Sequence, residues 1–568
     1  AELLAVRAQI YGRPQQEVAA CAALSARYPD DPALRLALAH SQLRASDYAA
    51  ALTAAEAALE LDPRDPQATL ARAEALTYLE RFDEAATALA EAEALYDRLG
   101  LLSGTARVAE LRGDLEFSRG RLASAMEYYG AAAKLFQATG RPVRGARAEK
   151  ARADVQLKLG DLTAAVATYR RIEPTFREAG FYAAVVEMLS SLGGALYLEG
   201  RLEDAERTLR AALDEARKLD NRALMLAPML TLANLLGYSG RSAEARPLAD
   251  EILELGRELR DREAPFFART LLGSDALHTG DLARAQRIFR RMIHEADDAG
   301  SAEWRAYALV ALAGTLLAAE KTGPALEALD EAIAINERLG LAVDLGYALA
   351  LRGRVRAELG EAARAIEDLD RAEEIATQDE TPLGDLEDTV RATRGWAALL
   401  EAQWERADEV LAPLVEPQRE PPSASVAMTA LIGNAYALSR LGRSDAAIAL
   451  AERAASHEQA GALERLAGQL CLADIAARRA AVPTAPSSVE IEAQRVLERA
   501  VDWGLPLTRA RAGALLLSHR AGRAPRTLRQ HARDGLRDYL HEVPSERRAF
   551  VRRRWDVSAV EQVLNAEH

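Results

Sequence analysis

The chain is 568 residues long, and 49% of these residues are hydrophobic while only 5% are aromatic. A single hydrophobic core does not grow to this size, so the length indicates several domains or a repeat array, and the many Ala, Leu, Glu and Arg residues favour helices. The net charge of −14 argues against a chain that binds nucleic acid over its whole surface.

The first hundred residues follow a 34-residue period. We predict helix–turn–helix units over residues 1–100, and the helical pattern is already under way at Ala1. The chain is therefore expected to be a piece of a longer protein, in which an effector domain precedes it. The turns of this first segment fall at Gly12, Ser46 and Glu80.

From residue 101 to residue 460 the chain follows a longer, 40-residue period. A turn, usually Gly followed by Arg or Asp, has an Ala five positions after it and a small residue seven positions before it. The small residue lets two antiparallel helices approach closely, and Gly adopts the left-handed conformation that ends a helix. Each unit is therefore predicted to be helix A, a turn and helix B. The turns fall at Gly120, Gly160, Gly200, Gly240, Gly280, Glu320, Gly360, Ala402 and Gly442.

Three places depart from this pattern. Gly323 and Pro324 come late after Glu320, so we expect an irregular turn there. The Pro-rich stretch 417–422 is predicted to be a long loop between two helices of one unit. A second Pro-rich stretch, 483–486, coincides with loss of the register, so residues 461–487 are expected to form an irregular helix and a linker.

Residues 488–568 are predicted to form degenerate repeats and an Arg-rich helical cap. Between residues 505 and 556 there are 13 Arg, no Lys and five acidic residues. One interpretation is a capping face whose arginines pair with acidic neighbours. The alternatives are a docking surface for an acidic partner and a site for nucleic acid, and few aromatic residues are interleaved to support the last.

Several phrases resemble the tetratricopeptide repeat family. Residues 47–51 (DYAAA) and 81–85 (RFDEA) resemble its turn into helix B, 61–63 (LDP) resembles its repeat ending, and 433–436 (GNAY) resembles its helix A. The 40-residue units are similar to the variant found in kinesin light chains and in large bacterial signalling regulators, and 231–245 (TLANLLGYSGRSAEA) is the closest copy. The resemblance implies an all-α, right-handed α-solenoid of about 11–13 repeats whose concave wall is lined by helix A.

Catalytic, cofactor and metal motifs are missing from the sequence. There is no GxxxxGK[ST], HExxH or CxxC, and the eight His residues are scattered. Cys21 and Cys471 lie too far apart to suggest a disulfide or metal pair, which indicates buried thiols in a reducing cytoplasm. There is also no apolar run of membrane length and no signal peptide. We therefore expect a cytoplasmic protein that is not an enzyme, needs no cofactor and contacts no membrane.

The resemblance also implies where a ligand binds. Ligand contacts in the family come from positions on helix A that lie at fixed offsets before the turn, the nearest two and the farthest thirteen positions away. Asn234 is the strongest single candidate, because the family carries a ligand-binding Asn at that position. An alternative for the aromatic residues is packing between adjacent A helices. The candidates are Arg107, Asp114, Arg147, Lys150, Asp154, Tyr197, Asn234, Tyr238, Phe267, Ser274, Tyr307, Tyr347 and Arg354.

The wall formed by these candidates grades from charged near residues 107–158 to aromatic and apolar near residues 197–347. Such a wall suits an extended peptide or a helix, with cations holding carboxylates and aromatic rings supplying contact area. We predict a protein- or peptide-binding scaffold or sensor within a larger bacterial signalling or transcriptional regulator. The alternatives are a small-molecule or signalling-peptide sensor, nucleic-acid binding through the Arg-rich end, and self-association through an uncapped N-terminal repeat.

Overall fold

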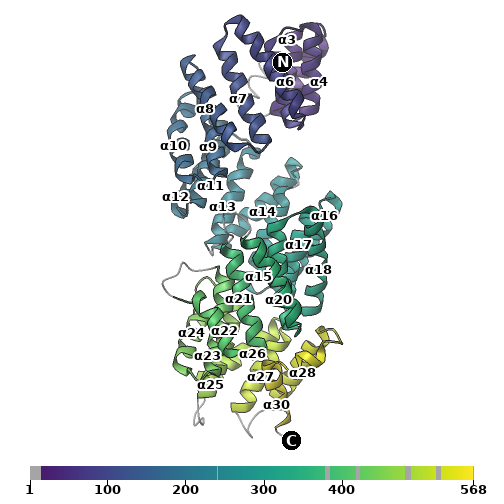
Figure 1. Cartoon of the computed structure of the whole chain (residues 1–568), viewed down its shortest axis with the longest axis vertical. Helices are drawn as coiled ribbons and strands as arrows, with labels where there is room; N and C mark the ends of the chain where they lie inside the picture. Colours follow the sequence, from purple (N-terminus) through teal and green to yellow (C-terminus); the bar gives the residue numbers. More distant parts are fainter. Residues whose placement is uncertain are drawn as a thin grey trace. The chain divides into compact units, whose positions relative to one another are not determined.

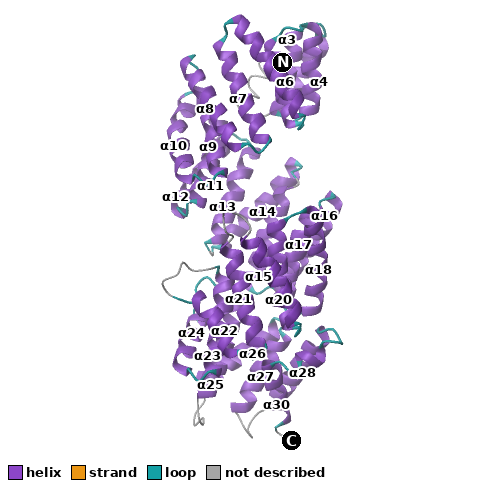
Figure 2. Cartoon of the chain, in the orientation of Figure 1, coloured by secondary structure: helices purple, strands orange, loops and turns teal. Residues whose placement is uncertain are grey.

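The computed structural model of the chain describes residues 14–239, 241–261, 263–377, 384–416, 423–479, 488–519 and 526–566. Every regular element among these residues is a helix, which confirms the predicted all-α fold (Figure 2). No described helix is both long enough and apolar enough to cross a membrane. The chain divides into two compact units, unit 1 up to Pro265 and unit 2 from Phe266 onward.

Unit 1 is a stack of helical hairpins in chain order (Figure 1). Each helix packs against the next, and alternate helices such as α3 and α5 also touch, which is the packing of an α-solenoid. Its helices are α2 (Pro14–Arg27), α3 (Pro32–Arg44), α4 (Tyr48–Leu61), α5 (Pro66–Tyr78), α6 (Phe82–Leu99), α7 (Leu102–Ser118), α8 (Leu122–Ala138), α9 (Pro142–Lys158), α10 (Leu162–Glu178), α11 (Tyr182–Leu198), α12 (Leu202–Lys218), the 3₁₀ helix η1 (Arg222–Met225), α13 (Leu226–Tyr238) and α14 (Ser242–Leu259).

Helix length explains the change of period along the chain. The helices α3, α4 and α5 have 13 or 14 residues, whereas α7, α8 and α9 have 17 each. These helices of the longer repeat therefore gain almost one turn each, at about 3.6 residues per turn. The A helices α7 and α9 thus offer more length for the inner wall than α3 and α5 do.

The turns follow one hydrogen-bond pattern. At Gly200, φ is 78°, its N–H donates to the carbonyl of Tyr197 at 3.0 Å, and the next N–H donates to Leu196 at 2.9 Å. The same pattern closes the turn at Glu320, where φ is 59°. The expected irregular turn at Glu320 is wrong, because Pro324 falls in the first helical turn of the following helix, where no N–H is needed.

A second series of left-handed glycines ends the B helices. Gly100, Gly140, Gly180, Gly300 and Gly340 have φ between 65° and 74°. Each of them lies midway between two of the turns that the sequence pattern predicts. The longer repeat thus has one left-handed turn at each end of its B helix, a regularity that the Gly-Arg phrase does not capture.

The small residue seven positions before each turn is required by packing. A Cβ atom on Gly193 would lie 2.5 Å from Cγ of Leu209, and one on Gly273 would lie 2.5 Å from Cζ of Phe289. In both repeats the side chain that would clash belongs to the B helix that follows. The predicted close approach of helix A and helix B at this position is therefore confirmed.

Unit 2 continues the hairpins and ends in a set of C-terminal helices (Figure 1). Its helices are α15 (Glu263–Thr279), which begins just before the unit boundary, α16 (Leu282–Ala299), α17 (Ala302–Ala318), α18 (Thr322–Leu339), α19 (Ala342–Glu358), α20 (Ala362–Thr377), α21 (Gly384–Leu400), α22 (Trp404–Leu411), the 3₁₀ helix η2 (Ala412–Leu414), α23 (Ala424–Arg440), α24 (Ser444–Ala455), α25 (Ala462–Arg479), α26 (Ser488–Asp502), α27 (Pro506–His519), α28 (Arg526–Glu542), α29 (Arg548–Val551) and α30 (Trp555–Asn565).

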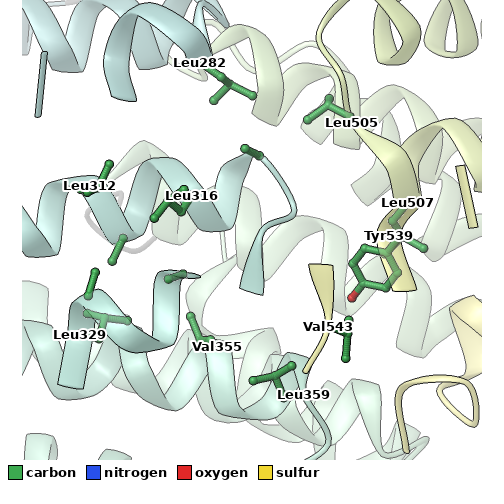
Figure 3. Packing of buried hydrophobic residues seen from close by; sticks show 14 of the residues in the cluster. Leu282, Leu312, Leu316, Leu329, Val355, Leu359, Leu505, Leu507, Tyr539 and Val543 are labelled. Atoms are coloured by element: carbon green, nitrogen blue, oxygen red, sulfur yellow. The ribbon is translucent and has the colours of Figure 1, made fainter. Parts of the chain in front are cut away.

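The C-terminal helices share one hydrophobic core with the repeats of unit 2. Leu507 and Tyr539 from the C-terminal part of the chain belong to the same buried cluster as Val355 and Leu359 of the repeats (Figure 3). All four are buried. The end of the chain therefore turns back onto the repeats of this unit instead of extending the stack.

Some predictions fall on residues outside the described part of the chain. They concern Ala1, the turns at Gly12 and Gly240, and the two Pro-rich stretches 417–422 and 483–486. The proposed boundaries at residues 100, 460 and 487 stay predictions.

Candidate functional site

Two candidate residues of unit 1 are held by tyrosines of the following B helix. Tyr129 of α8 donates to Asp114 of α7 at 2.6 Å, and Tyr169 of α10 donates to Asp154 of α9 at 2.6 Å. Burial raises the pKa of Asp114 to about 7, although the hydrogen bond from Tyr129 lowers it. These carboxylates tie helix A to helix B within a repeat.

Two candidate cations of unit 1 are also paired within the chain. Arg107 contacts Glu74 and Glu110, each at 2.7 Å, and so joins α7 to α5 of the preceding repeat. Lys150 forms an ion pair with Asp154 at 3.0 Å. Ligand contact at either position requires that these pairs be shared or opened.

Other candidates of unit 1 are accessible. Arg147 is exposed, with its guanidinium 5.9 Å from the ring of Phe181, and Asn234 is exposed on α13. Tyr197 is half-buried on α11. The side chain of Tyr238 lies outside the described residues.

The N-terminal end of α9 carries a cluster of positive charge. Arg141, Arg144 and Arg147 are exposed, and none has an ion pair among the described residues. Partial desolvation of the Arg144 guanidinium, which lies 6.0 Å from the ring of Phe136, lowers its pKa; the positive charges of Arg107, Arg147 and Arg141 lower it further, and the charge of Glu110 opposes them. The α9 arginines, as we call Arg141, Arg144 and Arg147, therefore form an exposed cluster of positive charge that has no ion pair among the described residues.

In unit 2 three of the five candidate residues line a pocket of about 760 Å³. Ser274, Tyr347 and Arg354 are among its walls, and so are Val310, Gly314, Leu317, Thr389, Trp396, Thr429, Ile432 and Tyr436, which occupy the same helix A positions in their own repeats. A volume of about 300–1,000 Å³ is usual for a site that encloses a small ligand. Many positions that the register selects therefore face the pocket, while binding by them stays a prediction.

Phe267 and Tyr307 lie outside this pocket. They are 48% and 45% exposed, and Phe266 lies between them, with ring centroids 6.3 Å from Phe267 and 5.8 Å from Tyr307. Trp304 stacks on Phe266 at 5.0 Å. Packing between adjacent A helices, the alternative role for the aromatic candidates, accounts for the contacts of Phe266 with Trp304 and Tyr307, whereas Phe266 and Phe267 are neighbours on one helix.

The opposite wall of the pocket comes from the C-terminal helices. It includes Leu507, Thr508 and Arg511 of α27 together with Tyr539 and Asp556. Sequence analysis missed these residues because their segment keeps only a weak repeat register. The signal that was available is the substitution at Glu320, where a carboxylate replaces the expected Gly.

Three successive repeat turns contact the C-terminal part of the chain. The carboxylate of Glu320 accepts hydrogen bonds from the backbone N–H groups of Leu507 and Thr508, which begin α27. A Cβ on Gly280 would lie 3.2 Å from the ring of Trp503, and one on Gly360 would lie 3.1 Å from Phe550. Burial raises the pKa of Glu320, and its hydrogen bonds with Thr508 and Leu507 oppose that rise.

A buried ionic network also joins the C-terminal part of the chain to the repeats of unit 2. Arg554 is 6% exposed and donates to the backbone carbonyl of Glu358 at 2.7 Å, to its carboxylate at 2.6 Å and to Asp556 at 2.7 Å. The hydroxyl of Tyr539 lies 3.1 Å from the same guanidinium. Burial alone raises the pKa of Asp556, but the charge of Arg554 reverses this and lowers it below the ordinary value.

Comparison with known protein families matches three segments of unit 1. Residues 36–99 and 111–183 match one family model described as tetratricopeptide repeat, and residues 182–258 match another of the same description. The chain carries tetratricopeptide repeats. The matched residues lie within unit 1, and the 40-residue spacing continues into unit 2 as far as Gly360, with further turns at Ala402 and Gly442.

Several solved structures are similar in fold to this tetratricopeptide-repeat chain. A Rap protein in complex with competence and sporulation factor is 16% identical, with a TM-score of 0.43 over 61% of this chain and 98% of that one. A signal transduction ATPase with a tetratricopeptide repeat sensor from Pyrococcus horikoshii is 15% identical, with a TM-score of 0.45 over 70% and 57%. The Cut9–Hcn1 assembly is 14% identical, with a TM-score of 0.41 over 94% and 95%. No curated protein sequence matches the chain.

The Arg-rich end that follows the tetratricopeptide repeats is largely paired within the chain. Its described ion pairs include Arg509 with Asp538 at 2.7 Å, Arg511 with Asp474 at 3.7 Å, Arg537 with Asp534 at 2.9 Å, Arg547 with Glu361 at 2.6 Å and Arg554 with Glu358 at 2.6 Å. This is the arrangement that the capping interpretation expects. No group of three or more possible metal ligands occurs among the described residues.

Proposed function

We propose that this chain is the sensor or scaffold region of a larger bacterial signalling or transcriptional regulator, and that it binds an acidic protein segment or peptide on the inner wall of unit 1. Tetratricopeptide repeats are stacked helical units whose extended concave surfaces suit protein binding. We place the protein in the cytoplasm, where free, buried Cys21 and Cys471 stay reduced. Binding, and not catalysis, is its role in this proposal.

The observation that carries the proposal is the charge of the α9 arginines. Three exposed arginines within two helical turns repel one another unless an anion from outside neutralises them. Arg147 occupies a predicted contact position, and Asn234 is exposed at another of these positions. An acidic segment laid along these A helices would supply carboxylates to the arginines and a hydrogen-bonding backbone to the Asn.

The test is a binding screen of the full chain against short peptides of graded acidity. We expect acidic peptides to bind, and the double variant Arg144→Glu, Arg147→Glu to weaken that binding about tenfold or more, since each lost charged hydrogen bond costs about 1.5–3 kcal/mol. The matched control is Lys134→Glu, which reverses an exposed charge on the B helix α8. Equal binding by the double variant and the control, or no preference for acidic peptides, contradicts the proposal.

A second candidate function, a sensor for a small molecule or short signalling peptide, is favoured by the pocket of unit 2. Its walls come from the repeats on one side and from α27 and the residues around Arg554 on the other. This arrangement limits the space for an extended partner and suits a small ligand. Nucleic-acid binding through the Arg-rich end is less favoured, because the arginines named above are engaged inside the chain.

A further inference from the structure

One arginine of α19 differs from its neighbours on the same helix. Arg352 contacts Asp368 at 2.7 Å and Asp330 at 2.8 Å, and Arg356 contacts Asp368 at 2.7 Å. Arg354, between them, points to the other side of the helix and lines the pocket of unit 2. Its only ionic contact among the described residues is from Nε to Glu358 at 3.4 Å.

The carboxylate that Arg354 shares is already occupied. Glu358 accepts from Nε1 of Trp396 at 2.9 Å and from Arg554 at 2.6 Å. Arg354 itself stacks over Trp396, with its guanidinium carbon 4.1 Å from the ring centroid. The two Nη nitrogens of Arg354 carry four of the five N–H donors of the guanidinium. Neither of them has an acceptor among the described residues. Burial lowers the pKa of Arg354, and the nearby charge of Arg554 lowers it further.

The acidic side chains that line the pocket, unlike Arg354, already have hydrogen-bond partners in the protein. Glu320 is bound by the start of α27, Glu358 by Trp396 and Arg554, and Asp556 by Arg554. Glu464 accepts from the N–H of Gly461 at 2.8 Å. Each carboxylate on the described wall of the pocket accepts hydrogen bonds from the protein. The Nη groups of Arg354, in contrast, lack an acceptor in the described part of the chain.

The remainder of the wall is mainly aliphatic. It includes Leu277, Val310, Leu317, Leu351, Ile432, Leu466 and Leu470. Such a wall gains free energy by covering apolar ligand surface. Three arginines line the pocket: Arg511 pairs with Asp474, Arg554 pairs with Glu358 and Asp556, and Arg354 has only the shared Glu358. The pocket thus combines an apolar wall with one cationic group, that of Arg354, which lacks an ionic partner of its own among the described residues.

We propose that the unit 2 pocket binds a small molecule that has a compact apolar body and one anionic group, a carboxylate or a phosphate, and that Arg354 pairs with that group. This inference rests on the second candidate function above and gives the ligand a chemical class. Stacking on Trp396 fixes the plane of the guanidinium, so that its two Nη groups are presented together to a bidentate anion.

Binding of simple probes to the full chain tests this inference. Titration calorimetry with decanoate, decyl phosphate and decanol compares two anionic heads with a neutral one on the same apolar body. We expect at least one of the anions to bind about tenfold or more tightly than decanol, which is the effect of one charged hydrogen-bond pair. The tighter of the two anions identifies the head group.

Two variants and a control distinguish recognition of the anionic group from binding of the apolar body in the pocket. Arg354→Gln should reduce the affinity for the anionic probes to that for decanol, while Arg391→Gln, at an exposed position of α21, should leave it unchanged. Gly314→Leu should abolish binding of all probes, since a Cβ on Gly314 meets only Leu351 at 3.9 Å and a longer side chain fills the pocket without a clash. This variant also removes a helix glycine and should not impair folding.

The outcomes distinguish the two levels of the proposal. If decanol binds as tightly as decanoate and Gly314→Leu abolishes both, the pocket is a small-ligand site but the anion proposal is overturned. If the folded wild-type chain binds none of the probes, the anion proposal and the small-molecule function both fail. Neither result bears on the acidic peptides expected at the α9 arginines, which have their own assay.

Discussion

The carboxylate of Glu320 accepts a hydrogen bond from the backbone N–H of Thr508 at 3.0 Å, across 188 positions of sequence. Thr508 lies in the first turn of α27, where backbone N–H groups have no partner within the helix. Glu320 itself has a φ of 59°, a conformation that disfavours residues with a Cβ. Glu in place of Gly at this repeat turn thus has a local conformational cost. In return, its side chain caps the N-terminus of α27.

A pair of matched substitutions tests this explanation. Glu80 has a φ of 60°, is exposed, and has no side-chain hydrogen bond among the described residues. We expect Glu80→Gly to stabilise unit 1 by about 1 kcal/mol, because the left-handed strain is relieved. Glu320→Gly relieves the same strain but loses the cap, so we expect a net loss of about 1 kcal/mol in unit 2. Urea unfolding of the full chain measures both, and equal effects would contradict the capping role.

Adjacent glycines of α11 give a second matched pair. A Cβ on Gly193 would lie 2.5 Å from Cγ of Leu209, whereas one on Gly194 meets no atom within 4 Å. We expect Gly193→Ala to destabilise unit 1 by about 1–3 kcal/mol through overpacking. Gly194→Ala should stabilise it by up to about 1 kcal/mol through helix propensity. Thermal unfolding followed by circular dichroism compares them, and a stable Gly193→Ala variant would show that the hairpin can separate without cost.

The helical order of the chain was predictable because its determinants are local. A left-handed residue, a small residue seven positions earlier and an Ala five positions later specify one hairpin, and each hairpin packs on the next in the chain. The same register placed Ser274, Tyr347 and Arg354 on the wall of the unit 2 pocket. It did so because residues at fixed offsets from a turn share one face of helix A.

The return of the C-terminal helices was not predictable in this way. Its contacts join residues that are far apart in the sequence, such as Glu320 with Thr508 and Glu358 with Arg554. No periodicity relates such pairs, and in the sequence the Glu at position 320 looks like an interruption of the turn pattern. The Arg-rich composition of residues 505–556 likewise does not distinguish Arg554, which is buried, from Arg552 and Arg553, which are exposed.

The burial of Asp114, which accepts a hydrogen bond from Tyr129, predicts that the stability of unit 1 depends on pH. Burial raises the pKa of Asp114 from 3.8 to about 7 in the folded state. The folded chain therefore retains a proton that the unfolded chain releases, so the contribution of Asp114 to stability is greatest below about pH 4 and is lost as the pH rises through 7.

Asp114→Asn isolates this contribution, because the amide oxygen still accepts from Tyr129 but does not titrate. We expect the stability of Asp114→Asn relative to the wild type to rise between about pH 4 and pH 7, as measured by urea unfolding at several pH values. Tyr129→Phe removes the donor that favours the ionised carboxylate and should shift the window to higher pH. Parallel pH profiles for the wild type and Asp114→Asn would show that the carboxyl titrates normally.

The buried network predicts different roles for two neighbouring arginines. Removing the Arg554 guanidinium leaves Glu358 and Asp556 without their main counter-ion in the interior, and breaking a buried pair in this way costs about 3–5 kcal/mol. We therefore expect Arg554→Gln to destabilise unit 2 strongly, whereas Arg553→Gln, at an exposed position, should change stability by less than about 0.5 kcal/mol. Denaturant unfolding of the full chain gives both values. If the two variants lose the same small amount, the C-terminal helices are not fastened by Arg554, and the pocket that they close against the repeats would need another explanation.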